Sequence, residues 1–171
     1  EQGFLDRSSE LVTMAYLYLN AEAPYYAGAV IEKGFADELV DDKSKNYELV
    51  GSAWAQAREV AKSIPMMEKA AAKSDEGELF VRLGNVYLDG DQFTKAADSV
   101  EKGLKKGGVK RPDQARLVLG MAYFNLGEYD KARRAFRAAG KDDRSAKYSK
   151  QWIAYVTSEE DRQRELEKDL F

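Results

Sequence analysis

Large apolar side chains recur along this chain at the spacing of one helix face. In one stretch, two large residues, a small residue and an aromatic residue stand at positions i, i+3, i+4 and i+7: Phe80, Leu83, Gly84 and Tyr87. Because an α-helix has about 3.6 residues per turn, these side chains share one face, and that face must be buried. The strict alternation of apolar and polar residues that is typical of strands is not found. The pattern therefore predicts an all-α fold.

The same pattern returns several times, which is the mark of a repeat protein. Its small residue appears as Ala15, Gly51, Gly84 and Gly120, at offsets of 36, 33 and 36 residues. The large and aromatic residues return in the same frame. Four repeat units are therefore expected.

Each unit is also expected to contain a second helix that packs against the first. Twelve residues after the small residue comes another small side chain, and a large apolar residue follows four positions later. A glycine inside a helix costs about 1 kcal/mol relative to alanine, so its presence needs a packing reason, which the close approach of a second helix supplies. Turn residues such as Asp89-Gly90-Asp91 lie between the two helices and favour an antiparallel hairpin. In the second helices, these small and large residues are Ala27 and Ile31, Ser63 and Met67, Ala96 and Val100, and Ala132 and Phe136.

We expect a single domain over residues 1–171 that ends in a capping helix. The repeats are predicted at residues 8–43, 44–76, 77–112 and 113–144, followed by a helix over 145–170. That last helix begins like another first helix, with Tyr148, Trp152 and Tyr155, but continues as a charged run with no answering helix. A repeat array needs a capping helix at its end, with one apolar face packed on the last repeat and one polar face exposed to solvent. The start of the chain has no comparable element, so further repeats are expected upstream.

One residue disturbs the pattern. Pro65 falls inside the second helix of the second unit, where it lacks a backbone donor and disfavours helix at Ile64. A kink or a late helix start is expected there.

The repeated pattern resembles the tetratricopeptide repeat (TPR), in which an aromatic, Leu-Gly, Tyr, Ala and Phe occupy set positions over about 34 residues. The resemblance extends from Ser9 to Ala139. It implies a right-handed TPR superhelix, an all-α solenoid of about four helix-turn-helix repeats. It also implies that the first helices line a concave groove that binds a peptide or protein segment.

A narrower resemblance covers the later part of the chain. Residues 102–112, 119–136 and 143–164 are similar to the C-terminal part of a proteobacterial TPR protein described as a candidate component of the TonB system. This similarity implies a periplasmic accessory of TonB-dependent energy transduction, with TonB-system components as partners. It also implies an export signal upstream of this chain, which itself shows no signal peptide. A cytoplasmic location stays open.

Composition removes most enzyme classes. The chain contains no cysteine and no histidine, which excludes thiol nucleophiles, Ser-His-Asp triads, and metal sites built from those residues. We therefore expect no enzyme activity, no cofactor and no metal. The remaining enzyme alternative is a pair of carboxylates acting as general acid and base, which would need a closed pocket that desolvates them.

Charge and hydropathy narrow the partners to proteins. The net charge is -3, and no apolar run approaches the roughly 20 residues that span a membrane, so neither nucleic-acid binding nor direct membrane insertion is expected. One basic cluster could meet an acidic partner or phosphate, but a solvated surface is the favoured interpretation because Glu101 and Asp113 interrupt the cluster and no aromatic residues stand between its members. Residues 1–60, by contrast, carry 11 acidic and 5 basic side chains, a polarity that could favour head-to-tail association. The basic cluster consists of Lys102, Lys105, Lys106, Lys110, Arg111 and Arg116.

The candidate groove residues lie on the first helices, on the face not used for packing. Asn, Gln and Asp side chains can bond an extended backbone, while aromatic residues and Met offer apolar anchors. A clamp for a terminal carboxylate is disfavoured, because Val12, Glu48, Val81 and Leu117 stand where lysine would be needed. The proposed partner-binding residues are Tyr16, Asn20, Gln56, Arg82, Asn85, Asp89, Met121, Phe124 and Asn125.

Two interpretations of the function remain beside the carboxylate alternative. In the first, the chain is a protein–protein interaction scaffold or adaptor that binds a partner segment in the groove. In the second, it is a self-association module of a larger repeat protein, with an apolar edge around Leu11, Met14 and Tyr18 that would give a homo-oligomer.

Overall fold

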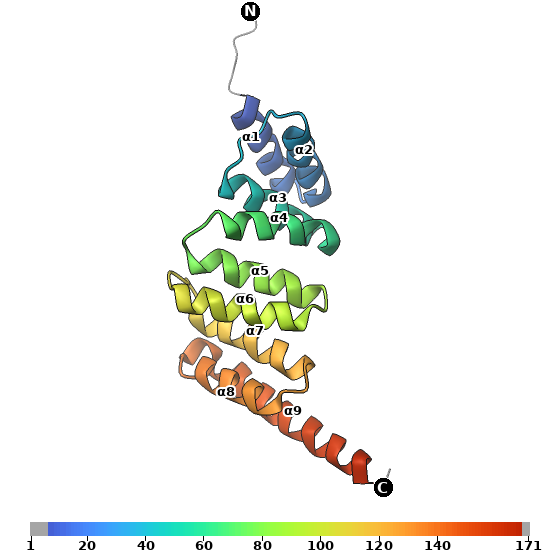
Figure 1. Cartoon of the computed structure of the whole chain (residues 1–171), viewed down its shortest axis with the longest axis vertical. Helices are drawn as coiled ribbons and strands as arrows, with labels where there is room; N and C mark the ends of the chain where they lie inside the picture. Colours follow the sequence, from blue (N-terminus) through green and yellow to red (C-terminus); the bar gives the residue numbers. More distant parts are fainter. Residues whose placement is uncertain (1–6, 169–171) are drawn as a thin grey trace, which may run out of the picture. The chain divides into compact units, whose positions relative to one another are not determined.

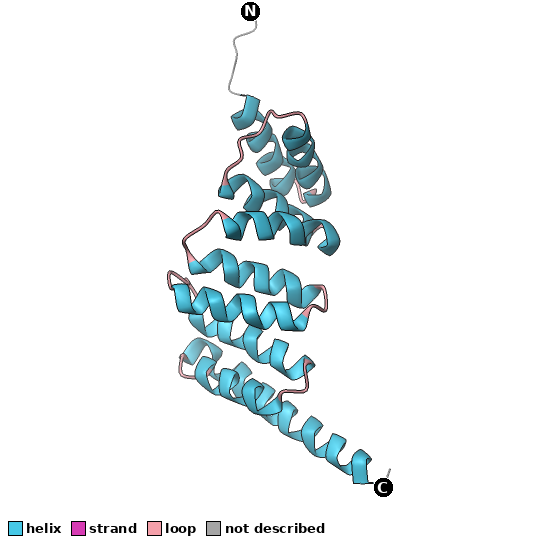
Figure 2. Cartoon of the chain, viewed as in Figure 1, coloured by secondary structure: helices cyan, strands magenta, loops and turns pink. Residues whose placement is uncertain are grey.

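The computed structural model describes residues 7–168, and this part of the chain consists of nine helices without a strand (Figures 1 and 2). Short turns join the helices in pairs. Residues 169 and 170, where we expect the capping helix to end, lie outside the described residues. The helices are α1 (Arg7–Asn20), α2 (Pro24–Ala36), α3 (Ser44–Gln56), α4 (Val60–Ala72), α5 (Gly77–Asp89), α6 (Phe93–Lys106), α7 (Pro112–Asn125), α8 (Tyr129–Ala139) and α9 (Asp143–Lys168).

The helices form two compact units, divided between Asp75 and Glu76. Unit 1 contains the hairpins α1–α2 and α3–α4. Unit 2 contains the hairpins α5–α6 and α7–α8, followed by α9. Within each unit, every hairpin packs against the next element, so each apolar stripe is buried between neighbouring helices.

The core of unit 1 follows the predicted stripes. Ala15, Ala27, Ile31, Val50 and Trp54 are buried in one apolar cluster shared by its first three helices. Small side chains alternate with large ones, so the helices approach closely and leave little empty space.

The small residues of the stripes allow the predicted close approach. In unit 2, a Cβ atom on Gly84 would lie 2.4 Å from Val100 Cγ2, and one on Gly120 would lie 2.5 Å from the ring of Phe136. Atoms cannot approach so closely without displacement, so glycine is required where the two helices of each hairpin cross. The packing reason that we inferred for these glycines is confirmed.

Pro65 does not delay its helix. Helix α4 begins at Val60, five residues before the proline, so the predicted late start is wrong. The first turn is held by Ser63, whose backbone N–H donates to the Glu59 carbonyl and whose hydroxyl donates to the Gly51 carbonyl at 2.7 Å. The burial of Ser63 and Met67 against α3 outweighs the local preference against helix before proline.

The turn inside every hairpin contains one residue in the left-handed conformation. These residues are Glu22, Arg58, Asp91 and Gly127, with φ of 56°, 62°, 55° and 73°. They follow one another at 36, 33 and 36 residues, the same offsets as the small residues of the stripes. The repeat therefore extends from the side-chain pattern to the backbone conformation of the hairpin turns.

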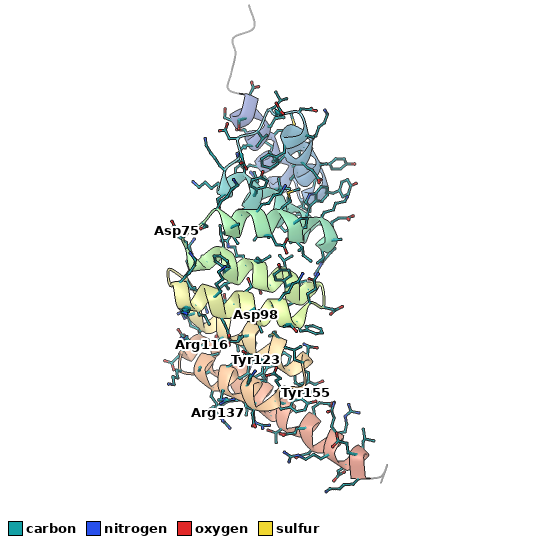
Figure 3. The ribbon with its side chains drawn as sticks, in the orientation of Figure 1. Asp75, Asp98, Arg116, Tyr123, Arg137 and Tyr155 are labelled. Carbon is teal, nitrogen blue, oxygen red and sulfur yellow. The ribbon has the colours of Figure 1, made fainter. Side chains whose placement is uncertain are left out.

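Polar contacts fix α7 against its neighbours. Tyr123 lies on α7 (Figure 3). Its hydroxyl donates to Glu101 Oε1 on α6 at 2.5 Å, and burial together with this carboxylate raises the pKa of Tyr123. At the other end of α7, Asp113 is only 3% exposed and accepts a bond of 2.8 Å from the Ser145 hydroxyl at the start of α9. These bonds set the position of α7 between α6 and α9.

Helix α9 covers the last hairpin. Its Val156 is fully buried in a cluster with Ala132 and Phe136 of α8, and its Ser149 packs against Gly140. No helix in the described part of the chain is both long enough and apolar enough to cross a membrane.

Candidate peptide-binding groove

A surface hollow of about 410 Å³ lies between α5 and α7 in unit 2. Apolar side chains from both helices line it, and polar side chains come from both helices and from the loop before α7. The lining residues are Glu78, Val81, Arg82, Asn85, Val109, Lys110, Arg111, Gln114, Ala115, Leu117, Val118 and Met121.

The repeat explains why these residues meet. Neighbouring first helices carry equivalent positions at the same height, and the offset between α5 and α7 is 36 residues. Three pairs of equivalent positions line the hollow: Glu78 and Gln114, Val81 and Leu117, and Asn85 and Met121. The hollow therefore lies on the helix face that carries the groove positions Val81, Asn85, Leu117 and Met121.

The polar residues of α5 are partly held in place by the protein itself. Asn85 Nδ2 donates to the Val81 carbonyl at 3.0 Å, which leaves its Oδ1 as an acceptor at the surface. The Glu78 carboxylate lies 3.5 Å from the Arg82 guanidinium and accepts the backbone N–H of Lys110 at 2.9 Å. This second bond ties the loop before α7 to α5 and shapes that end of the hollow.

Arg111 is engaged by a buried carboxylate. Its Nη2 and Nε donate to the two carboxylate oxygens of Asp113 at 2.7 and 3.0 Å. This bidentate bond, with the hydrogen bond from Ser145, holds the pKa of Asp113 well below its usual range even though burial opposes the shift. Arg111 is therefore a structural residue of the rim. The neighbouring Lys110 ammonium forms no ion pair within residues 7–168.

Three of the proposed groove residues, Arg82, Asn85 and Met121, line the hollow. Phe124 lies next to it under aromatic rings of α9, with ring centroids 5.1 Å from Tyr155 and 6.0 Å from Trp152. The others are exposed at the C-terminal ends of α5 and α7. They are Asp89 and Asn125, and Asn125 Nδ2 donates to the Met121 carbonyl.

The remaining three proposed residues belong to unit 1. Tyr16 and Asn20 are exposed on α1, and Gln56 is exposed at the end of α3. A hollow of about 560 Å³ on α1 is lined by Ser9, Glu10, Leu11, Thr13, Met14 and Leu17, and neither Tyr16 nor Asn20 lines it. The binding role of the proposed residues in unit 1 stays a prediction.

Several lining residues were not predicted from the sequence. Only the buried face and one row of groove positions on each first helix were considered. Glu78 and Gln114 lie three residues before Val81 and Leu117, so the same helical register would have found them. Lys110 was assigned to the basic cluster and not to the groove. Its place on the rim depends on the backbone bond to Glu78, which sequence spacing does not reveal.

The basic cluster is divided by the fold. Lys102 lies 4.4 Å from the ring centroid of Phe80, Arg111 pairs with Asp113, and Lys110 faces the hollow. The cluster is therefore not one continuous basic surface.

The lining of the hollow suits binding better than catalysis. Glu78 is its single carboxylate, and the hollow is open to solvent, so a pair of desolvated carboxylates is not formed there. No group of three His, Cys, Asp or Glu side chains that could hold a metal occurs in the described part of the chain. Apolar side chains beside amide groups can hold an extended polypeptide.

Comparison with known proteins agrees with this architecture. A family model described as tetratricopeptide repeat matches residues 81–146, which includes α7, α8 and most of α5 and α6. Among curated proteins, no sequence match is found.

Solved structures of similar fold cover most of the chain. MamA is 25% identical with a TM-score of 0.69, over 82% of this chain and 81% of MamA. YrrB, described as a TPR protein with an unusual peptide-binding site, is 21% identical with a TM-score of 0.73, over 90% and 78% of the two chains. A MamA segment from Desulfovibrio magneticus RS-1 is 16% identical with a TM-score of 0.72, over 98% of both chains.

The helical hairpins, the family model and the structural neighbours together confirm the predicted all-α TPR fold. Residues 81–146 are similar to the tetratricopeptide repeat family, and the described residues have the all-α TPR fold of these solved structures.

Proposed function

We propose that this chain is a protein-interaction scaffold that binds an extended segment of a partner protein in the hollow between α5 and α7. The observation that carries the proposal is the composition of that hollow. Val81, Leu117, Val118 and Met121 offer apolar surface, while Asn85 and the other amide and charged groups stand around it. A side chain of the partner can bury itself against the apolar surface while its backbone bonds to the amides.

Two features of the hollow support binding of a peptide in particular. Met121 is flexible and adapts to side chains of different shape. Asn85 and Gln114 each provide an amide that can both donate to and accept from a peptide backbone. YrrB is described as having a peptide-binding site. Because its likeness to this chain shows the fold alone, the proposal depends on the residues of the hollow.

The test is a selection of peptides from a phage-displayed library of random dodecapeptides, followed by titration of the enriched peptides. We expect the Asn85→Ala/Met121→Ala double variant to bind them at least about tenfold more weakly, which corresponds to about 1.4 kcal/mol. Asn46→Ala is the control, because the Asn46 amide also donates to a backbone carbonyl but lies in unit 1, outside the hollow and apart from the proposed groove residues. Equal binding by all three proteins would contradict the proposal.

A role in the TonB system and a periplasmic location belong to the proposal as its more specific part. They rest on the sequence resemblance of residues 102–112, 119–136 and 143–164. Cell fractionation of the full-length protein tests the location. Crosslinking in cells, with recovery of TonB-system components that depends on Asn85 and Met121, tests the partner. A cytoplasmic protein would contradict both.

A second candidate function is self-association through the outer face of α1. Met14 and Leu17 are 44% and 63% exposed there, and with Leu11 they line the hollow of about 560 Å³. Tyr18, by contrast, packs against the core of unit 1 and does not line that hollow. Sedimentation equilibrium should then show an oligomer that Leu17→Glu dissociates, whereas a monomer at all concentrations would exclude this function.

A further inference from the structure

We propose that α9 is a third wall of the peptide groove as well as the cap of the repeats. Its exposed tyrosines would bind a large apolar side chain of the partner segment. The inference rests on the proposed function, because it concerns the same segment as the hollow between α5 and α7.

The repeat register continues from α7 onto α9. The positions that α7 contributes to the hollow, Gln114, Leu117 and Met121, reappear on α9 34 residues later as Tyr148, Gln151 and Tyr155. Helix α9 also packs against both helices of the preceding hairpin, as α7 does. The face of α9 that carries Tyr148 and Tyr155 is thus the equivalent of the groove face of α7.

Aromatic contacts join this face to α7. The ring centroid of Tyr155, which Figure 3 labels, lies 5.1 Å from that of Phe124 on α7 and 5.8 Å from that of Trp152 on α9. Trp152 is fixed from below, because it stacks on Phe136 at 5.2 Å with an interplanar angle of 12°. Gln151, Trp152 and Tyr155 line a shallow hollow of about 200 Å³. The aromatic surface is therefore supported by the core of unit 2 and continuous with α7.

The exposure of these rings is what a cap alone does not explain. Tyr148 and Tyr155 are 58% and 53% exposed, although the buried face of α9 is already formed by Ser145, Ser149 and Val156. A helix that only covered the last hairpin would be expected to show polar side chains on its outer face. Tyrosine and tryptophan are enriched in protein interfaces because their rings provide rigid apolar area and their polar atoms can form hydrogen bonds with water or a partner.

These observations define the chemistry of the ligand. It is an extended segment that places one side chain in the hollow between α5 and α7 and a second, large apolar side chain on the rings of Tyr148 and Tyr155. Because the ring of Phe124 joins the surface of α7 to Tyr155 on α9, we expect one segment to occupy both places, and not two separate ligands.

The experiment uses the phage-selected peptides and the full chain. We expect Tyr148→Ala/Tyr155→Ala to weaken their binding at least about tenfold, with an unchanged melting temperature because both residues are exposed. Lys150→Ala is the matched control, since Lys150 is exposed on another face of α9. Replacing the conserved large apolar residue of the selected peptides by alanine should weaken binding to the unaltered chain, but not further weaken binding to the tyrosine variant.

The outcomes separate this inference from the proposed function. If Asn85→Ala/Met121→Ala loses binding while Tyr148→Ala/Tyr155→Ala keeps it, the groove exists but α9 is only a cap, and the inference is overturned. If neither variant loses binding, the proposed function itself is wrong.

Discussion

The glycines of the packing stripes place strict limits on side-chain size. A Cβ atom on Gly84 would lie 2.4 Å from Val100 Cγ2 and 3.1 Å from the Ala96 carbonyl oxygen. We expect Gly84→Ala to destabilise the protein by about 1–3 kcal/mol through overpacking, although alanine is the better helix former. Urea denaturation followed by circular dichroism measures the change.

Val100 provides the control for this prediction. If the clash is the cause, Val100→Ala should cost less in the Gly84→Ala background than in the unaltered chain, because it removes the atoms that the new Cβ meets. A Gly84→Ala variant that is more stable than the unaltered chain would show that the two helices are not so closely packed.

The buried carboxylate of Asp113 gives a pH-dependent contribution to stability. Its pKa is lowered in the folded protein by the Arg111 guanidinium and the Ser145 hydroxyl, whereas an unfolded Asp has a pKa of about 3.9. The contribution is therefore fully present above about pH 4 and is lost as the pH falls toward the folded pKa. We expect Asp113→Asn to cost about 2–3 kcal/mol at neutral pH, because it breaks charged hydrogen bonds.

Urea midpoints of the two proteins between neutral and acid pH test this prediction. The difference between the unaltered chain and Asp113→Asn should shrink as the pH is lowered below about 4. Asp89→Asn serves as the control, because Asp89 is exposed. A constant difference down to acid pH would mean that the ionised carboxylate is not what stabilises this contact.

The burial of Asp113 could not be predicted from the sequence. An acidic residue just after Pro112, at the start of a helix, is readily understood from the helix dipole. Its burial follows from contact with Ser145, which is 32 residues away, and from the loop that brings Arg111 across it. Neither contact has a periodic signal in the sequence.

Among the elements, the turns of the hairpins are under the clearest backbone constraint. Gly127 has a φ of 73°, and a Cβ built on it would meet no atom within 4 Å. Any loss of stability in Gly127→Ala therefore comes from the left-handed conformation alone, and we expect about 1–2 kcal/mol. Gly127→Asn should lose less, since asparagine tolerates this region. Equal thermal stability of both variants and the unaltered chain would contradict the assigned conformation.

The helical hairpins were predictable because each one repeats the same stripe of large and small residues. Four copies of a pattern make chance agreement improbable, and the burial of Val100 and Phe136 follows directly from it. The second role proposed for α9 was not predicted. Its Tyr148 and Tyr155 were assigned to a capping helix, and the 34-residue register from the groove positions of α7 was not followed onto them.

Considering the whole molecule, the division into two units predicts that unit 2 folds alone. The apolar cluster of α7, α8 and α9 and the hollow between α5 and α7 both lie within unit 2. A fragment of residues 76–171 should therefore be helical, unfold cooperatively and bind the selected peptides with the affinity of the full chain. Circular dichroism and titration measure both, and a disordered fragment would contradict the division.

The left-handed turn residues have a practical consequence for engineering. Glu22 and Arg58 adopt a conformation that glycine or asparagine adopts with less strain, and both lie in turns of unit 1. Exchanging them offers a route to a hardier variant for crystallisation or for display of chosen peptides. Since the proposed recognition surface lies on α5, α7 and α9, a thermostable scaffold and an altered specificity could be designed independently of each other.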